Sequence, residues 1–159
     1  MRYAQDYHLL PVLTATSVTA ASTSTQFVNM SNNLWVDFHV ILGALTGDDL
    51  TITVEECTAN ATATDSATEV AIPFCYRKCV AVASDTFGAL TTNDSGGLVV
   101  SADETGLCFV ISVDPASLDE GYNYVRVTLA ESSSTSAAVK AVNAILYPRY
   151  MQAIPPSST

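Results

Sequence analysis

The chain has 159 residues, of which 48% are hydrophobic and only 14% charged, and its 16 acidic and 6 basic residues give a net charge of −10. This length suits one domain with its own core. The negative charge argues against binding to a nucleic-acid backbone, which depends on Lys and Arg. No apolar run approaches the roughly 20 residues of a membrane-spanning helix. The low charge fraction favours an oligomer or a layer within a larger particle.

The first 25 residues differ in composition from the rest of the chain. Residues 9–13 form a short apolar run that Pro11 interrupts, and residues 14–25 are mostly small and hydroxyl-bearing. Because Pro11 excludes a continuous helix, we expect an extended N-terminal arm over residues 1–25, with a locally packed first strand as the alternative. The apolar run is too short for the core of a secretion signal, so we expect synthesis in a cytoplasm.

Residues 34–43 and 50–55 alternate between apolar and more polar positions, which is typical of strands with one buried face. In the first run the inward set is Val36, Phe38, Val40 and Leu42, and the opposite set is Trp35, Asp37, His39 and Ile41. Gly47 lies between the two runs and supplies a turn. We therefore predict that the two strands form a hairpin.

Further strands are predicted over residues 70–83, 98–101, 107–113, 124–129 and 137–147. Pro73 suits a strand start or a bulge. Asp114 and Pro115 predict a capped helical turn, which Gly121 closes. Strands at short spacing without a long helix indicate an all-β fold, a single β-sandwich or jelly-roll-like domain over residues 26–150. Residues 151–159 are expected to form a flexible tail.

The four cysteines, Cys57, Cys75, Cys79 and Cys108, allow three interpretations. They are free thiols, disulfides within or between subunits, or metal ligands. Cys75 and Cys79 lie four residues apart on a predicted strand, so their Cα atoms are about 13 Å apart and cannot be bridged to each other. Cys57 and Cys108 would be the partners of any disulfide. The spacing of the cysteines is a weak zinc signal, and we expect no metal.

No catalytic pattern is evident in the sequence, and we expect neither an enzyme nor a cofactor. The histidines are His8 and His39, and His39 lies beside Asp37 on the polar side of a predicted strand. No G-x-S-x-G motif provides a nucleophile setting, and no phosphate-binding loop is present. Paired acids near predicted turns are interpreted as solvated residues rather than calcium ligands.

Two stretches of the chain resemble small virion proteins of tailed bacteriophages. The C-terminal stretch contains FVISVDPASLDEGYNYVRVTLA and AVNAILYPRYMQAIPPS, with a strand ending in VD, an LDxG turn, a YVRV strand and a last strand ending in PRYxQ before a Pro-Ser tail. The N-terminal stretch, QFVNMSNNLWVDFHVILGALTGDDLTITVEEC, is similar to that family in its strands and turn. The resemblance covers roughly Gln26 to Ser157 and rests on structural motifs. The four cysteines and the long N-terminus depart from the family.

The resemblance implies a non-enzymatic virion protein that binds the outer capsid lattice and stabilises it, as a decoration or cement protein. The expected partners are the major capsid protein and further copies of the chain in a trimer, without nucleic acid or membrane. The expected location is the outer capsid surface, after synthesis in the host bacterial cytoplasm.

Aromatic residues and Arg are enriched in interface cores, and they guide the choice of contact residues. The expected contacts to the capsid or to other subunits are Tyr3, Tyr7, Leu9, Leu10, Leu13, Tyr147, Arg149 and Tyr150. As the alternative, Tyr147 and Tyr150 only close the sandwich. Two other functions stay open: a neck, tail or fibre-attachment virion protein, and a carbohydrate- or surface-binding module in which Trp35 and Tyr122 line a sugar platform.

Overall fold

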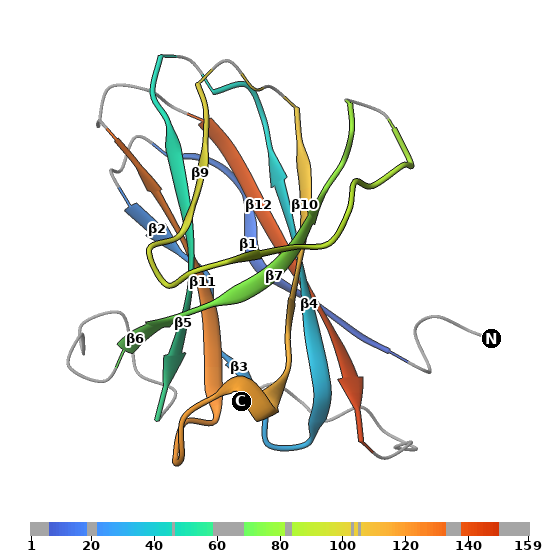
Figure 1. Cartoon of the computed structure of the whole chain (residues 1–159). Coiled ribbons are helices and arrows are strands. Elements are labelled where there is room, and N and C mark those ends of the chain that lie inside the picture. Colours follow the sequence, from blue (N-terminus) through green and yellow to red (C-terminus); the bar gives the residue numbers. More distant parts are fainter. Residues whose placement is uncertain are drawn as a thin grey trace.

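The computed structural model describes residues 7–18, 22–45, 47–58, 69–81, 84–102, 104, 106–132 and 138–149. Within these ranges the secondary structure consists of β-strands and one short 3-10 helix, and the strands form two antiparallel sheets that face each other (Figure 1). This arrangement confirms the predicted all-β, sandwich-like domain. No helix in this described part of the chain is long and apolar enough to cross a membrane.

Sheet A has six strands in the spatial order β1-β12-β4-β10-β7-β8. The strands are β1 (His8–Val18), β4 (Asn33–Leu42), β7 (Phe74–Lys78), β8 (Thr91–Asn93), β10 (Cys108–Val113) and β12 (Ala138–Pro148). β4 and β12 pair over almost their full length, from Leu42 opposite Lys140 to Trp35 opposite Tyr147. The strands predicted over residues 34–43, 107–113 and 137–147 are therefore confirmed.

Sheet B also has six strands. Four of them lie in the order β2-β11-β5-β6, β3 pairs with β11, and β9 pairs with β5. The strands are β2 (Ser22–Ser24), β3 (Val28–Asn29), β5 (Leu50–Cys57), β6 (Glu69–Ile72), β9 (Leu98–Val100) and β11 (Tyr124–Glu131). β6 ends and β7 begins on either side of Pro73. The proline thus marks a strand start, as the sequence predicted, and the chain passes there from sheet B to sheet A.

The predicted hairpin between residues 34–43 and 50–55 is wrong, although both strands exist. β4 pairs with β12 and β10 in sheet A, whereas β5 pairs with β11, β6 and β9 in sheet B. Gly47 has a φ of 88°, so the expected turn conformation is present, but the connection crosses from one sheet to the other. Leu45 is buried in the core on this connection. Alternation predicts a strand with one buried face, and it does not say which sheet supplies the neighbour.

The boundary predicted at residue 25 does not match the boundary of the sheets. β1 is an edge strand of sheet A that pairs with β12 from His8 opposite Leu146 to Val18 opposite Ala138, and β2 pairs with β11. The alternative of a packed first strand therefore describes residues 8–18. Register irregularities flank Leu13, after Pro11, and an edge strand tolerates proline because its outward N–H needs no partner in the sheet. Residues 1–6 of the predicted arm and the predicted tail at residues 151–159 lie outside the described residues.

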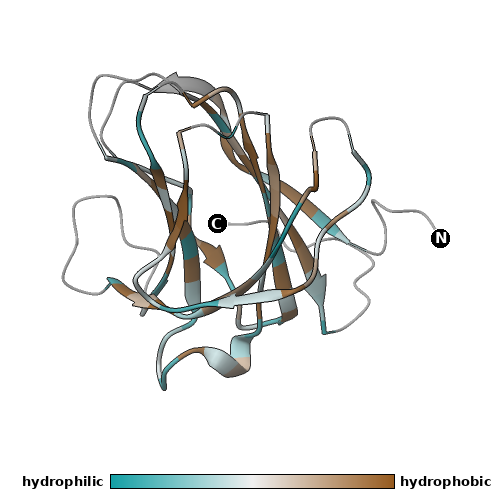
Figure 2. Ribbon diagram, turned by 45° about the horizontal axis from the view of Figure 1, so that its top comes forward, coloured by the Kyte–Doolittle hydropathy of each residue, from teal (hydrophilic) through white to brown (hydrophobic). Residues whose placement is uncertain are grey.

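The hydrophobic core lies between the two sheets and is supplied by alternate residues of their strands. Phe38 on β4 and Phe109 on β10 face Leu50, Ile52 and Leu129 from sheet B, and all five side chains are almost completely buried. Figure 2 shows the corresponding alternation of hydrophobic and hydrophilic residues along the strands. Full burial of such side chains contributes about 1.5–3 kcal/mol each. The opposite residues of the same strands form the two outer faces.

Candidate functional site

The outer face of sheet A carries large apolar side chains that the fold leaves exposed. Leu9 on β1, Trp35 and Ile41 on β4, and Val139 on β12 are 52%, 45%, 47% and 48% exposed. Trp35 and Ile41 alternate along β4 with buried core residues, so they point away from the core. Apolar residues gathered on one face mark an interaction surface more often than scattered single ones do.

Three aromatic side chains from distant parts of the sequence meet on this outer face. The Tyr7 ring lies edge-on to the Tyr147 ring with 4.8 Å between centroids, and the Trp35 ring lies 4.9 Å from Tyr147 at an interplanar angle of 49°. The pairing of β12 with both β1 and β4 brings them together. Aromatic pairs at such distances contribute about 0.5–1.5 kcal/mol beyond their buried area. We call Tyr7, Trp35 and Tyr147 the aromatic cluster.

A groove of about 320 Å³ opens next to Trp35 on the same side of sheet A. Its lining comes from the ends of β4, β10 and β7: Trp35, Asp37, Cys75, Ser112, Val113 and Asp114. Asp37 lies opposite Ser112, which in turn lies opposite Cys75, so one row of neighbouring strands places three of these side chains together. The groove therefore combines an exposed indole with two carboxylates and a hydroxyl.

Hydrogen bonds within the fold hold both carboxylates of the groove in place. Ser112 Oγ donates to Asp37 Oδ1 at 2.6 Å. Asp114 caps the 3-10 helix η2 (Pro115–Ser117), where its Oδ1 accepts from the N–H of Ala116 at 2.8 Å, as the sequence predicted. Among the described residues neither carboxylate forms an ion pair. Burial lowers the pKa of nearby His39 below its usual value, against the opposing effect of Asp37, so His39 supplies little positive charge at neutral pH.

The Ser112, Asp37 and His39 side chains do not have the order of a catalytic triad. In a triad the histidine lies between the serine and the carboxylate and takes the hydroxyl proton. Here the Ser112 hydroxyl donates directly to Asp37. The residues that the structure describes also contain no group of three or more His, Cys, Asp or Glu that could hold a metal ion. The arrangement is suited to binding a ligand by stacking and charge.

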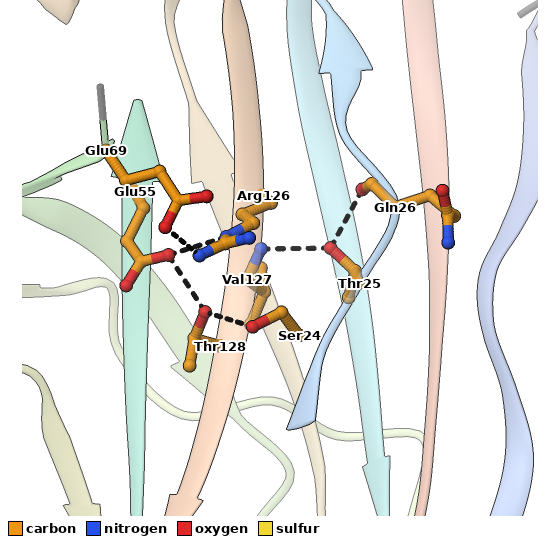
Figure 3. A network of polar contacts seen from close by, with 8 residues as sticks. All are labelled: Ser24, Thr25, Gln26, Glu55, Glu69, Arg126, Val127 and Thr128. Atoms are coloured by element: carbon orange, nitrogen blue, oxygen red, sulfur yellow. Dashed lines mark hydrogen bonds and ion pairs between the residues drawn. The ribbon is translucent and has the colours of Figure 1, made fainter. Parts of the chain in front are cut away.

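Sheet B presents a different outer surface, in which the charges are paired with one another (Figure 3). Arg126 Nε donates to Glu55 Oε2 at 2.6 Å, and its Nη2 donates to Glu69. Thr128 donates to the same Glu55 oxygen at 3.0 Å, and the Phe27 ring packs 4.9 Å from the guanidinium. The network is internally satisfied, so we assign it a role in stability and place the candidate site on sheet A.

Two buried carboxyl groups lie inside the sandwich and belong to neither outer face. Glu56 is 1% exposed, and its Oε2 accepts from the N–H of Asp119 at 2.9 Å. Burial raises the pKa of the Glu56 carboxyl, while the bond from Asp119 partly opposes this. Lys140 Nζ lies 2.7 Å from Glu131 Oε1, and these two side chains are 0% and 1% exposed. This ion pair joins β12 of sheet A to β11 of sheet B.

Disulfides within the chain, one of the interpretations left open by the sequence, are contradicted, because no two of the four cysteines lie at bonding distance. Disulfides between subunits stay a prediction. Cys57 and Cys79 are buried, and Cys75 and Cys108 are half-buried. Cys108 and Cys79 are neighbours across β10 and the end of β7, where the Cys108 N–H donates to Cys79 Sγ at 3.0 Å. Burial first, and the neighbouring Cys79 second, raise the pKa of the Cys108 thiol. The interpretation as reduced thiols describes the structure.

The structure brings together part of the predicted contact set. Tyr7 and Tyr147 meet in the aromatic cluster, and Leu9 is exposed beside them on the outer face. Arg149 is exposed and donates through Nε to the Asn33 carbonyl at 3.2 Å.

Other members of that set are placed elsewhere. Leu10 and Leu13 are partly buried and pack against the hydrophobic core, and their contact with a partner stays a prediction. Tyr3 and Tyr150 lie outside the described residues. Tyr122, suggested with Trp35 as a sugar platform, does not line the groove.

Sequence reasoning did not find the groove itself. Asp37 and Trp35 were on the polar side of one predicted strand, and Asp114 was a predicted cap, but their proximity depends on β4 pairing with β10. The available signal was that acidic or aromatic residues occupy the outward positions near the start of β4 and directly after the end of β10. Comparisons with models of protein families, with curated proteins and with solved structures find no match for this chain.

Proposed function

We propose that this chain is a non-enzymatic virion protein that binds the outer surface of a bacteriophage capsid and stabilises the lattice, as a trimeric decoration or cement protein. The observation that carries the proposal is the outer face of sheet A, where the aromatic cluster lies among exposed apolar residues from both ends of the sequence. The resemblance of residues 26–157 to small phage virion proteins supplies the identity of the partner.

The composition of this face suits a protein partner. Interface cores are rich in aromatic residues and Arg, and the outer face of sheet A offers Trp35, Tyr147, Leu9 and Ile41. A sheet face is also rigid, so little conformational entropy is lost when it docks. A layer of such domains over neighbouring capsid subunits adds buried interface without any chemical step.

Binding to particles that lack the chain tests the proposed face. The particles come from the phage whose genome encodes the chain, with its gene deleted, and bound protein is quantified after sedimentation. The double variant Leu9→Ser/Ile41→Ser should reduce occupancy about tenfold or more, because truncating interface anchors costs more than about 1 kcal/mol each.

Val70→Ser/Val99→Ser is the matched control, because these valines are 43% and 60% exposed on sheet B. This control should bind like the original chain, and circular dichroism should show that both variants fold. Equal binding by the sheet A and sheet B variants would remove the outer face of sheet A from the proposal.

A further inference from the structure

The groove beside the aromatic cluster has a shape and charge that specify its occupant more closely than the rest of the face. It is lined by the exposed indole of Trp35 and by two carboxylates, from Asp37 and Asp114. The chain carries a net charge of −10, so its surface potential attracts cations. An anionic or purely apolar ligand would leave both carboxylates desolvated without compensation.

Each carboxylate has one oxygen committed to the fold and a second oxygen available to a ligand. Asp37 uses Oδ1 for Ser112, and Asp114 uses Oδ1 for the N–H of Ala116. Within the described part of the chain no hydrogen bond engages the other oxygen of either residue. The internal bonds fix both side chains before binding, which lowers the entropic cost of recognition.

A guanidinium group matches these features together. It is planar and stacks on an indole face, and tryptophan is the strongest cation–π partner among the aromatic side chains. Its five N–H donors lie in a rigid fork, so one group can reach carboxylates on two sides. A lysine ammonium is a compact, strongly hydrated charge that lacks the planar stacking surface.

We propose that the groove lined by Trp35, Asp37 and Asp114 binds an arginine side chain of the protein on which sheet A docks. This inference rests on the proposed function, because Trp35 belongs both to the groove and to the aromatic cluster, and the arginine would anchor the same interface. Charge complementarity between the acidic groove and a basic side chain fixes the register of docking and suppresses wrong partners.

The isolated chain provides a direct test, since Trp35 is its single tryptophan and lines the groove, so that its fluorescence reports on binding there. The probes are N-acetyl-arginine amide, N-acetyl-lysine amide and the uncharged analogue N-acetyl-citrulline amide at equal ionic strength. The arginine probe should give a saturable change, the lysine probe should bind about fivefold more weakly, and the citrulline probe should give no saturation. Absence of saturation with arginine, or equal binding of arginine and citrulline, would overturn the proposal.

The double variant Asp37→Asn/Asp114→Asn removes both charges and keeps the acceptor oxygens for Ser112 and Ala116. It should weaken binding of the arginine probe about tenfold or more. The control Asp85→Asn/Glu120→Gln removes the same charge from exposed residues that do not line the groove, and it should bind normally. Equal affinity of both double variants would contradict the proposal, and if the groove variant fails to fold, the citrulline comparison decides.

The occupant and the proposed function are tested separately. If sedimentation shows self-association that Asp37→Asn/Asp114→Asn abolishes, the arginine belongs to a second copy of the chain and the assignment to a different protein is wrong. Normal particle binding by the groove variant would refute the anchoring role and leave the proposed function intact. If the original chain binds the arginine probe but does not bind the particles, the proposed function is refuted and arginine binding by the groove is not.

Discussion

Replacing Lys140 by methionine should destabilise the fold strongly, because it leaves the Glu131 carboxylate buried without its cation. The two side chains are 0% and 1% exposed, so the pair belongs to the buried class, for which loss of one partner costs about 3–5 kcal/mol. For a chain of this length 1 kcal/mol corresponds to about 2–4 °C in Tm. The expected loss in Tm is therefore about 6–20 °C.

The double variant Lys140→Met/Glu131→Leu gives the opposite expectation. Among the described residues the two groups have no further hydrogen bonds, so their mutual attraction alone offsets the cost of desolvating both. Replacing such a pair by apolar side chains is often neutral or stabilising by about 1–4 kcal/mol. We therefore expect the double variant to be at least as stable as the original chain.

Urea denaturation followed by circular dichroism measures all three variants of this double-mutant cycle, with Glu131→Leu as the second single variant. The coupling energy should be large, because the two sites are in direct contact. A Lys140→Met variant within about 0.5 kcal/mol of the original chain would show that the pair is solvated in solution. A double variant as unstable as the sum of the single ones would show that the charges do not interact.

Three further predictions follow from other polar groups. Burial raises the folded-state pKa of Glu56 above its ordinary value of 4.5, so its contribution to stability is present below that value and is lost as pH rises through the raised folded-state pKa. Glu56→Gln should therefore increase the free energy of unfolding at pH 7, and this gain over the original chain should disappear at about pH 4. Denaturation at both pH values measures the gain, and a gain that is the same at both would contradict the raised pKa of Glu56. Arg126→Met should cost about 2–3 kcal/mol of stability because it leaves Glu55 and Glu69 without their cation. Lys78→Met should cost less than about 1 kcal/mol because the side chains of the Lys78–Glu104 pair are about one-third exposed. Equal losses of stability in thermal denaturation would refute this ranking. Iodoacetamide should modify Cys75 before Cys108 in the native protein, because the raised pKa of Cys108 reduces its thiolate fraction. After unfolding it should modify all four cysteines. An intact mass that shows fewer than four modifications after unfolding would restore the disulfide interpretation.

Strand positions were largely readable from the sequence, because a half-buried strand imposes a period of two on its residues. The runs around Phe38 and Phe109 and the capped turn at Asp114 were found in this way. The same alternation, extended beyond Val54, would also have placed Glu56 on the inward face of β5.

Strand pairing was not readable, because it depends on contacts between residues far apart in the chain. The missed crossing between β4 and β5 depends on which sheet each strand joins. The edge position of β1 and the aromatic cluster follow from the pairing of β12 with both β1 and β4. The buried Lys140 was missed for the same reason, since its burial depends on its ion pair with Glu131 on the opposite sheet. Groups of residues that meet only where distant strands pair or the two sheets pack can therefore be identified only from the structure.

The number of copies of this chain per virion tests the central proposal most directly. Quantitative mass spectrometry of purified particles of the phage whose genome encodes it gives this number relative to the major capsid protein. A decoration protein on the capsid lattice predicts hundreds of copies in stoichiometric ratio to capsid subunits. A count of six or twelve would place the chain in the neck or tail, and its absence from the particle would contradict a role in the virion.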